Sequence, residues 1–477
     1  MVEFQEDDNP KTSGNGLFLD TLDINMKVDS SLSRCNQFIL DRPPHNFQYF
    51  NSQIQAVSNY YNEISNDNIN IQSQIVLNGN NLENGYYKLS KDMELYSYSD
   101  IHLSDLFKES LELAKTDIES FLNLNPQINF DDIIFTVFHA GIGQDFSFPT
   151  FDPTVYDIKS AYIEPTMFGD IDYPQINGNN VSSGILLPET QNMIFFSSIE
   201  DIFYGESSYC DYQLGMTGTF SFLMGYALGL PPLFNTDSGQ PGVGIFSLMD
   251  YGSNNGRGII PALPSPWTRV IMDWDSENNM TSSVASDNFS LIEINKDEIY
   301  RFDISDNEYF LLENKINTIG NELSLEDIVS DYNATNGDNI YQDSYSNWLD
   351  AIISSNDQHN IFEFQDSVIT GVKNYNLGLP ASGILVWHIK EPQGSINDGI
   401  NNDIFNKSVS IEEADGVLDI GFESYALFSN QDPTAGTRWD FWYQENEAYH
   451  FANDIEHKCF NSETFELLDA SYNVECF

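Results

Sequence analysis

Residues 217–251 read TGTFSFLMGYALGLPPLFNTDSGQPGVGIFSLMDY, and this stretch combines an apolar helix with two sharp turns. From Thr217 to Leu228 there is no Pro and only one Gly, and most side chains are apolar. This pattern predicts a helix that is buried on nearly all sides. Gly229 is placed to end the helix, and Pro231-Pro232 prevents it from resuming. Further along, Ser247-Leu248-Met249 follows Gly242-Val243-Gly244.

The order of these elements resembles the active-site region of zinc metallopeptidases of the metzincin type. In those enzymes the helix carries His-Glu-x-x-His, because two residues four apart lie on one helical face and can both bind the metal. Gly229 lies three residues after the second-His position, where metzincins turn sharply towards a third ligand. Ser247-Leu248-Met249 is similar to their Met-turn, which lies beneath the metal site.

Other blocks of the chain extend this resemblance to a family, the immune inhibitor A-like secreted metallopeptidases. Several blocks occur in the same order over about residues 35–420, and each block alone would be weak. The blocks are IIFTVFHAG at 133–141, GLPPLF at 229–234, PSPWTR at 264–269 with Asp273-Trp274, EYFLLEN at 308–314, LPASGILVWHI at 379–389 and IEEADG at 411–416. The resemblance implies a metzincin-like α/β protease-type domain and secretion from the cell.

The chain departs from this family at the residues that perform the chemistry. Carried over position by position, the first His becomes Phe222 and the catalytic Glu becomes Leu223. The second His becomes Tyr226, and the acidic third-ligand position becomes Pro232. Phe, Leu and Pro side chains offer a metal no lone pair, and one Tyr does not replace three ligands. We therefore expect no catalytic residue and no zinc at this helix, and a metal cavity packed with apolar side chains.

Three other interpretations were weighed against this one. The segment could be an ordinary buried helix whose likeness to a metzincin is due to chance. A metal site could be built from other histidines, although no two are close enough in sequence to form a local ligand pair. A true His-Glu-x-x-His could lie elsewhere, but the motif occurs nowhere in the chain. The seven histidines are at positions 45, 102, 139, 359, 388, 450 and 457.

Composition limits the range of partners. The 477 residues include 73 Asp and Glu against 19 Lys and Arg, a formal net charge of -54. Such a surface repels nucleic acid and anionic membranes but attracts divalent cations, and it suits an extracellular medium. No apolar run is long enough to insert into a membrane. Residues 1–12 are acidic and polar, so no signal peptide is visible, although the resemblance implies a secreted, extracellular protein.

Hydrophobic patterning predicts an α+β protein. Residues 1–34 are polar and read as a leader or tail, residues 35–285 as a metallopeptidase-like domain with a degenerate zinc site, and residues 286–477 as a β-rich C-terminal domain. Apolar spacing predicts helices at 54–64 and 103–123 and strands at 69–77, 133–138, 299–304, 308–314 and 384–389. The polar insertion at 316–378 is long enough to suggest a functional or mobile segment.

Further residues fit a cleft or a calcium site. By the resemblance, His139, Ala140 and Gly141 lie near the cleft, although a lone His more often has a structural role. Asn235, Asp237 and Asp250 have oxygens that suit Ca²⁺, whereas an Asn-Thr-Asp-Ser-Gly run also forms turns without a metal. The acidic cluster Glu412-Glu413-Asp415 invites the same two interpretations, with a structural role favoured.

The four cysteines leave disulfide pairing open. Cys459 and Cys476 would close a short loop if the compartment is oxidising, whereas Cys35 and Cys210 are too far apart in sequence to judge.

Two functions follow from these observations. The first is a catalytically inactive homologue of the peptidases, a pseudoprotease that binds a peptide or protein ligand or acts as an extracellular scaffold. The second is an active metal-dependent endopeptidase that uses an unrecognised or atypical site. We favour the first, because a zinc ion without ligands cannot be held where it would activate water.

Overall fold

The structure is a computed structural model. It combines helices and sheets and is α+β, as the sequence predicts. All contacts given below refer to the described part of the chain. The structure describes residues 1–19, 40–81, 84–146, 152–196, 209–279, 298–320, 323–336, 351–352, 354–356, 359–392, 394–396, 399–422, 433–444, 446–452, 459–460 and 467–468.

A five-stranded sheet in the order β2-β1-β3-β7-β4 forms the centre of the N-terminal half. The first four strands in this order run parallel, and β4 lies antiparallel to β7 at the edge. The sequence correctly predicts an apolar central strand after residue 132, but β3 starts and ends later than expected. The bounds are β1 (Val2–Glu3), β2 (Tyr87–Lys88), β3 (Thr136–Ile142), β4 (Ala161–Ile163) and β7 (Gly184–Thr190).

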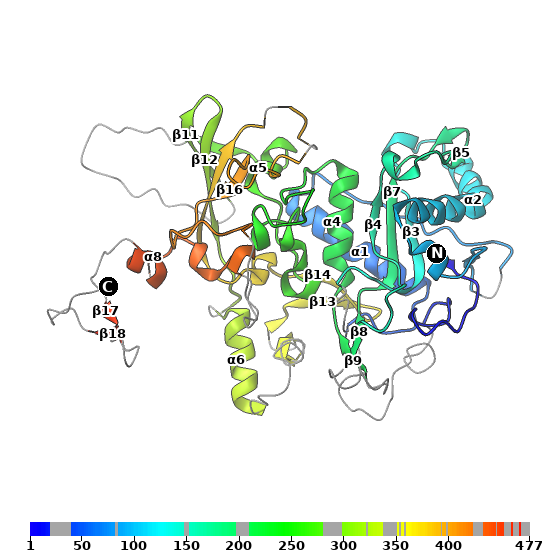
Figure 1. The fold of residues 1–477 in the computed structure, drawn as a ribbon, viewed down its shortest axis with the longest axis horizontal. Helices are drawn as coiled ribbons and strands as arrows, with labels where there is room; N and C mark the ends of the chain where they lie inside the picture. The colour runs from blue at the N-terminus through cyan, green and yellow to red at the C-terminus, as the bar shows by residue number, and fades with distance from the viewer. Residues whose placement is uncertain are drawn as a thin grey trace.

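Helices cover both faces of this sheet. Figure 1 shows α2 (Asp100–Leu124) on one side and α4 (Met216–Leu228) on the other, with α1 (Phe47–Ile64) next to α4. Phe138 of β3 packs edge-on against Phe220 of α4, with the ring centroids 5.7 Å apart. All three helices were expected from the spacing of apolar residues. The sheet and α1 therefore fix the position of α4.

A second five-stranded sheet, in the order β10-β11-β12-β15-β16, forms much of the C-terminal half. Its last four strands are antiparallel neighbours, and the predicted strands at 299–304, 308–314 and 384–389 are confirmed. Pairs of strands form four separate hairpins. The bounds are β10 (Glu277–Asn279), β11 (Ile299–Ser305), β12 (Glu308–Lys315), β15 (Gly383–Lys390) and β16 (Val409–Ile411), with the hairpins β5 (Gln175–Ile176) and β6 (Asn179–Asn180), β8 (Met193–Phe196) and β9 (Tyr209–Tyr212), β13 (Phe362–Gln365) and β14 (Val368–Val372), and β17 (Cys459–Phe460) and β18 (Leu467–Leu468).

Short helices connect these parts. The α-helices are α5 (Pro266–Ile271), α6 (Leu325–Asn336) and α8 (Glu447–Ala452). The 3₁₀ helices are η1 (Glu94–Tyr96), η2 (Phe130–Asp132), η3 (Pro165–Phe168), η4 (Gly244–Phe246), η5 (Tyr251–Gly258), η6 (Tyr375–Gly378), η7 (Pro433–Ala435) and η8 (Arg438–Asp440). The hydrophobic core runs through both sheets as one cluster, which is continuous across the predicted boundary at residue 285.

Two expectations about the N-terminal half are wrong. The described residues 1–19 are not a free polar leader, because β1 pairs with β2 and β3, and Phe4 is fully buried. Residues 69–77 form no strand. They run beside α1, where the Ser58 hydroxyl donates to the Ile71 carbonyl at 3.0 Å, but they pair with no strand of the described sheets.

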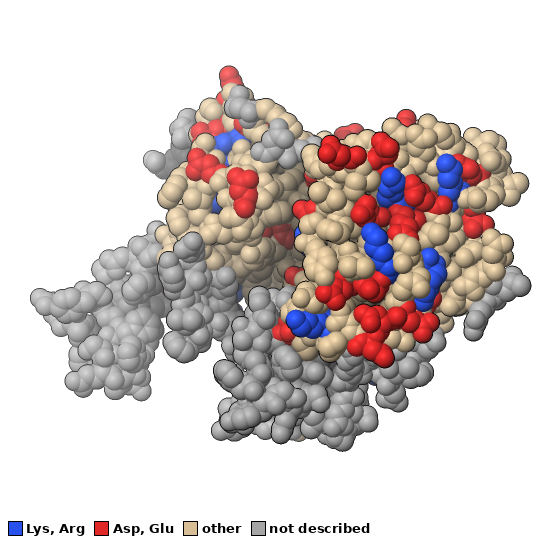
Figure 2. All heavy atoms as spheres, turned by 45° about the vertical axis from the view of Figure 1, so that its right-hand side comes forward, with Lys and Arg blue, Asp and Glu red and all other residues tan. Residues whose placement is uncertain are grey.

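The surface is acidic, as composition predicts. On the face shown in Figure 2, Asp and Glu side chains surround the fewer Lys and Arg side chains. Lys108 and Lys115 of α2 each pair with a Glu one turn further on, at 3.8 Å. Such exposed pairs contribute little stability. Asp and Glu outnumber Lys and Arg on this face, so most of its acidic charge is not compensated. None of the described helices has the length and apolar character needed to cross a bilayer.

Candidate functional site

The helix that carries the degenerate motif is α4. It ends at Gly229, whose φ of 86° lies in the left-handed region, and the Leu230 amide donates to the Gly225 carbonyl at 2.9 Å. This is the C-terminal cap that the sequence predicts, because Gly adopts a positive φ with little strain. The chain then turns through the buried Pro232 towards the segment beneath the helix.

The four replaced positions differ in their surroundings. Leu223 is 6% exposed, Phe222 and Tyr226 are half-buried, and Pro232 is buried. The Phe222 ring lies edge-on to the Tyr226 ring at 5.2 Å and tilted to the Phe234 ring at 6.1 Å. Aromatic packing therefore surrounds Phe222 and Tyr226, two of the positions that the resemblance aligns with zinc ligands.

Tyr226 is the one replaced position that still has an oxygen. Its ring stacks on Tyr162 of β4, with centroids 5.8 Å apart and an interplanar angle of 16°. Burial raises the pKa of Tyr226 above its usual range, and the nearby Glu164 and Asp250 add to the effect. The phenol is therefore kept neutral, which makes it a weak donor to a metal ion.

The Met-turn segment lies directly against α4. Ser247, Leu248 and Met249 are all fully buried. A Cβ atom at Gly225 would lie 2.5 Å from the Met249 sulfur, so the thioether packs onto the helix where Gly225 has no side chain. The Leu233 amide also donates to the Met249 carbonyl at 2.9 Å, which ties the turn to the segment after α4.

A cavity of about 240 Å³ opens beside two of the replaced positions. Its apolar lining comes from Phe222 and Leu223 of α4 and from Phe234, whereas Asp145 and Ser160 are among its polar lining. The sequence predicts that apolar side chains fill the space beside this helix, and the cavity shows that they fill it only in part. The other lining residues are Phe146, Thr219, Gly239, Asp250, Tyr251, Ser253 and Asn254.

The structure does not assemble the calcium site expected from Asn235, Asp237 and Asp250. The carboxylate of Asp250 instead accepts hydrogen bonds from the amides of Gly242, Val243 and Gly244 at 2.7–2.8 Å and from the Tyr251 amide at 2.8 Å. Burial raises its pKa to about 6, against the effect of these amides. The Asn235 side chain accepts from the amides of Asp237 and Ser238, so this loop is a turn.

The predicted cleft residues His139, Ala140 and Gly141 lie inside β3, since the strand continues to Ile142. His139 and Ala140 are fully buried, and none of the three lines the cavity beside Phe222. Burial lowers the pKa of His139 to about 4, so the imidazole is neutral. These residues belong to the core and not to the cleft.

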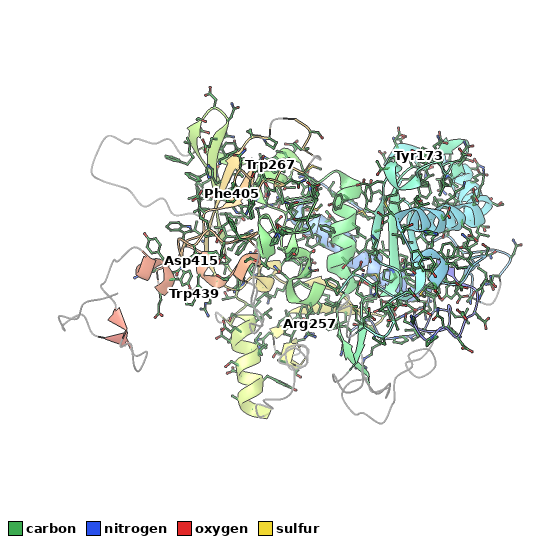
Figure 3. All side chains as sticks on the ribbon, viewed as in Figure 1. Tyr173, Arg257, Trp267, Phe405, Asp415 and Trp439 are labelled. Carbon is green, nitrogen blue, oxygen red and sulfur yellow. The ribbon has the colours of Figure 1, made fainter. Side chains whose placement is uncertain are left out.

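The expected acidic cluster is present with a different third member. Carboxylate oxygens of Glu413, Asp415 and Asp440 lie within 4.8 Å of one another. Figure 3 labels Asp415 and the nearby Trp439, which precedes Asp440. Glu412 points elsewhere and accepts from His388 at 2.8 Å. A set of carboxylates without His or Cys is of the type that hard cations such as Ca²⁺ prefer.

The remaining described histidines do not form a second metal site. His45 binds Glu189 at 2.7 Å, His388 lies between Glu308 and Glu412, and His102 contacts Ser99. In the part of the chain that the structure describes, the acidic triad is the group of potential ligands that lies close enough to hold an ion. The side chains of the four cysteines lie outside the described part of the chain, so the open disulfide pairing stays open.

Sequence reasoning missed several residues around the cavity. Asp145 accepts hydrogen bonds from the Ser160 amide and hydroxyl at 2.8 and 2.7 Å and from the Gln191 amide at 2.7 Å. Asp145, Ser160 and Gln191 belong to no sequence motif, and only the folding of the sheet brings them together. Tyr251, in contrast, lies two positions after Met249. Its place next to the Ser247-Leu248-Met249 block could have identified it from the sequence.

No family model, no curated protein and no solved structure matches the chain. The site is therefore interpreted from its own geometry, together with the resemblance of the sequence blocks.

Proposed function

We propose that the chain is a catalytically inactive relative of the immune inhibitor A-like metallopeptidases, and that it binds a peptide or protein ligand outside the cell. Three features support this proposal. The chain has a helix at the motif position, a sharp turn at Gly229 and a buried Met-containing turn against that helix. The side chains that would hold zinc and activate water are replaced by Phe222, Leu223, Tyr226 and Pro232.

The observation that carries the proposal is the cavity beside Phe222 and Leu223. Its volume of about 240 Å³ is below the range of about 300–1,000 Å³ that is typical of small-molecule pockets. It is better suited to one large side chain of a longer ligand. Its lining is apolar on α4 and polar at Asp145 and Ser160, so it can take an apolar side chain whose backbone remains outside.

The edge strand β4 supplies a place for that backbone. β4 pairs with β7 on one side and ends the sheet among the described strands. Ser160, which precedes β4, lines the cavity, and Tyr162 of β4 stacks on Tyr226 of α4. An extended peptide that pairs with a strand edge gains main-chain hydrogen bonds, and a neighbouring pocket selects its side chain.

The test is to fill the cavity and measure peptide binding. Peptides are first selected from a random displayed library on the wild-type chain, and their affinity is measured by fluorescence anisotropy. Thr219→Phe, on the cavity wall, is expected to weaken binding by at least about tenfold, because it occupies the volume that the ligand side chain needs. Thr116→Phe, on the exposed face of α2, is the matched control and should bind as wild type.

Unchanged binding by Thr219→Phe, or equal losses in both variants, would contradict the proposal. Failure to select any saturable peptide would also count against it.

A second experiment tests the relation to the peptidases separately. The combined change of Phe222 and Tyr226 to His, Leu223 to Glu and Pro232 to Asp restores the motif. If the helix and turn descend from a zinc site, the folded variant should bind zinc at one ion per chain, measured by elemental analysis after dialysis. A folded variant with no zinc affinity would contradict the alignment, whatever the peptide experiment shows.

A further inference from the structure

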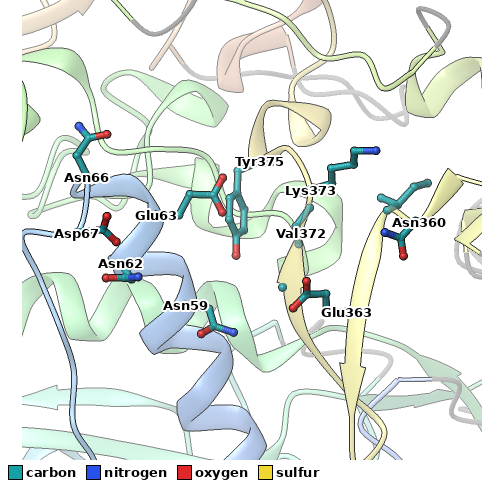
Figure 4. A pocket seen from close by; sticks show the side chains of 12 residues that line it. Asn59, Asn62, Glu63, Asn66, Asp67, Asn360, Glu363, Val372, Lys373 and Tyr375 are labelled. Atoms are coloured by element: carbon teal, nitrogen blue, oxygen red, sulfur yellow. The ribbon is translucent and has the colours of Figure 1, made fainter.

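A second and larger hollow lies between α1 and the β13–β14 hairpin. Its volume is about 690 Å³, and it shares no lining residue with the cavity at Phe222. Figure 4 shows the C-terminal half of α1 on one side and the hairpin on the other, with Tyr375 between them. We refer to this hollow as the α1 groove. Its size lies within the range of about 300–1,000 Å³ typical of small-ligand sites.

Carboxylates give the lining of the α1 groove a net negative charge. The lining contains three carboxylates, from Glu63, Asp67 and Glu363, and one ammonium group, from Lys373, which is a formal charge of 3 negative and 1 positive, or -2. The side chains of Asp67 and Glu363 make no hydrogen bond or ion pair with the described residues. Four Asn side chains add neutral amides, each with an acceptor oxygen and an NH₂ donor, from Asn59, Asn62, Asn66 and Asn360.

Tyr375 provides an observation that is independent of this charge. Its side chain is only 3% exposed, and its ring packs edge-on against Tyr60 at 4.9 Å. Its hydroxyl nevertheless has no hydrogen-bond partner among the described residues, and Figure 4 shows it directed into the space between α1 and the hairpin. The ring is thus buried while the hydroxyl opens into the groove, where its hydrogen-bonding capacity is left for a ligand atom or water.

The carboxylates lie close enough to Tyr375 to act on it. Burial raises the pKa of the Tyr375 phenol above its usual range, and the charges of Glu63 and Glu363 add to this effect. The hydroxyl therefore stays protonated, and its oxygen is free to accept a hydrogen bond. The Glu63 and Glu363 carboxylates and the Tyr375 hydroxyl oxygen line the same groove, so all three can accept hydrogen bonds from one ligand group that carries several donors.

The chemistry of this lining favours one class of ligand. An anion is repelled by the net charge, and a neutral polyol can donate hydrogen bonds to the carboxylates but does not compensate their charge. The groove carboxylates do not form a described group close enough to hold a metal ion, unlike Glu413, Asp415 and Asp440. A primary ammonium carries three donors and no acceptor, which complements the lining. We propose that the α1 groove binds a primary alkylammonium group, held by Glu63, Glu363 and the Tyr375 hydroxyl.

The test uses the full chain and 1,5-diaminopentane as the probe, in isothermal titration calorimetry at low ionic strength. We expect one saturable site that weakens as salt is added, because salt screens exposed charges. The double variant Glu63→Gln with Glu363→Gln should lose at least about tenfold in affinity, since charge-assisted hydrogen bonds are removed. Tyr375→Phe should lose about threefold, since one neutral hydrogen bond is removed.

The control must carry the same change in net charge, because a chain of charge -54 attracts any cation. Asp170→Asn with Asp172→Asn meets this need, since both residues are exposed and lie outside the groove. This control should bind within about twofold of wild type, because neither carboxylate lines the groove. Equal losses in the two double variants would overturn the proposal and indicate general counterion attraction.

Two further titrations distinguish the ligand chemistry. 1,5-Pentanediol should not bind; if it binds as tightly as the diamine, the groove recognises hydroxyl groups and the proposal is wrong. Displacement of the diamine by an equimolar amount of Ca²⁺ would also overturn it. A five-residue Gly peptide with a central Lys, compared with its acetyl-lysine form, shows whether the ammonium can belong to a peptide or must come from a free amine.

Discussion

At α4, the identities of single side chains decide whether the helix could bind a metal. Phe222, Leu223 and Tyr226 offer aromatic and aliphatic atoms at the positions that we propose to correspond to the imidazole and carboxylate groups of zincins. The loss of the ligands could be predicted from the sequence, because it depends only on residue identity. The cavity that remains could not be predicted, since it depends on how far the Phe222 and Phe234 rings fill the space.

Gly225 offers a direct test of how the Met-turn packs. In Gly225→Ala the new methyl group would lie 2.5 Å from the Met249 sulfur and 3.2 Å from the Tyr61 hydroxyl. We expect the free energy of unfolding to fall by about 1–3 kcal/mol, as for other overpacked cores. Urea denaturation of the purified variants measures this loss.

Met249→Ala provides the control, because it removes the atoms that the new methyl group meets. Gly225→Ala should cost less in the Met249→Ala background than in the wild type. An equal cost in both backgrounds would mean that Met249 does not pack on Gly225 as described.

At the scale of elements, the long amphipathic or apolar segments were predictable and the short ones were not. α1, α2 and the strands β11, β12 and β15 follow from periodicity over several residues. β1 spans only Val2–Glu3, too short for any period, and it becomes a strand because β2 and β3 lie on either side of it. Residues 69–77 have the alternation but find no partner, and a strand requires one.

The elements of the first sheet are joined by a buried polar network that the sequence did not reveal. The carboxylate of Glu189, 1% exposed, binds His45 at 2.7 Å and accepts from the Gly141 and Leu19 amides at 2.6 and 2.8 Å. The His45 ring also lies 2.9 Å from the Asp41 carbonyl oxygen. Glu189 lies 144 residues from His45 and 170 from Leu19, so no local pattern marks these contacts.

Breaking this network should be costly. Glu189→Gln leaves His45 without its anionic partner, and we expect a loss of about 3–5 kcal/mol in the free energy of unfolding. Glu112→Gln, which breaks the exposed pair with Lys108, should change it by less than about 1 kcal/mol. Urea denaturation compares the two variants, and similar losses would contradict the structural role of Glu189.

At the scale of the whole molecule, burial of carboxyl groups sets the pH dependence of stability. Burial raises the pKa of Asp157 and Glu413 to about 8 and that of Asp440 to about 7. The folded chain therefore holds these protons more tightly than the unfolded chain, and stability rises as the pH falls through these values. The Met1 amino group and His139 act in the opposite direction, because burial lowers their pKa values to about 5 and about 4. They cost stability as the pH falls below about 8 and about 6.5, respectively.

The raised pKa values of these carboxyl groups predict that the midpoint concentration of urea denaturation is higher at about pH 6.5 than at about pH 8.5, at constant ionic strength. The high acidic charge adds to the same trend, because protonation reduces self-repulsion. Asp157→Asn should reduce the difference, since it removes one of the titrating groups. A midpoint that is equal or higher at the alkaline pH would contradict the assignment of these buried carboxyls.

For the whole molecule, we propose that the chain is related to the metallopeptidases but holds no zinc at α4. The most direct measurement is elemental analysis of the purified chain for zinc, paired with a casein cleavage assay with and without a chelator. We predict no stoichiometric zinc and intact casein in both conditions, because the ligand positions are Phe222, Tyr226 and Pro232 and the catalytic position is Leu223. One zinc ion per chain together with chelator-sensitive cleavage would contradict the account.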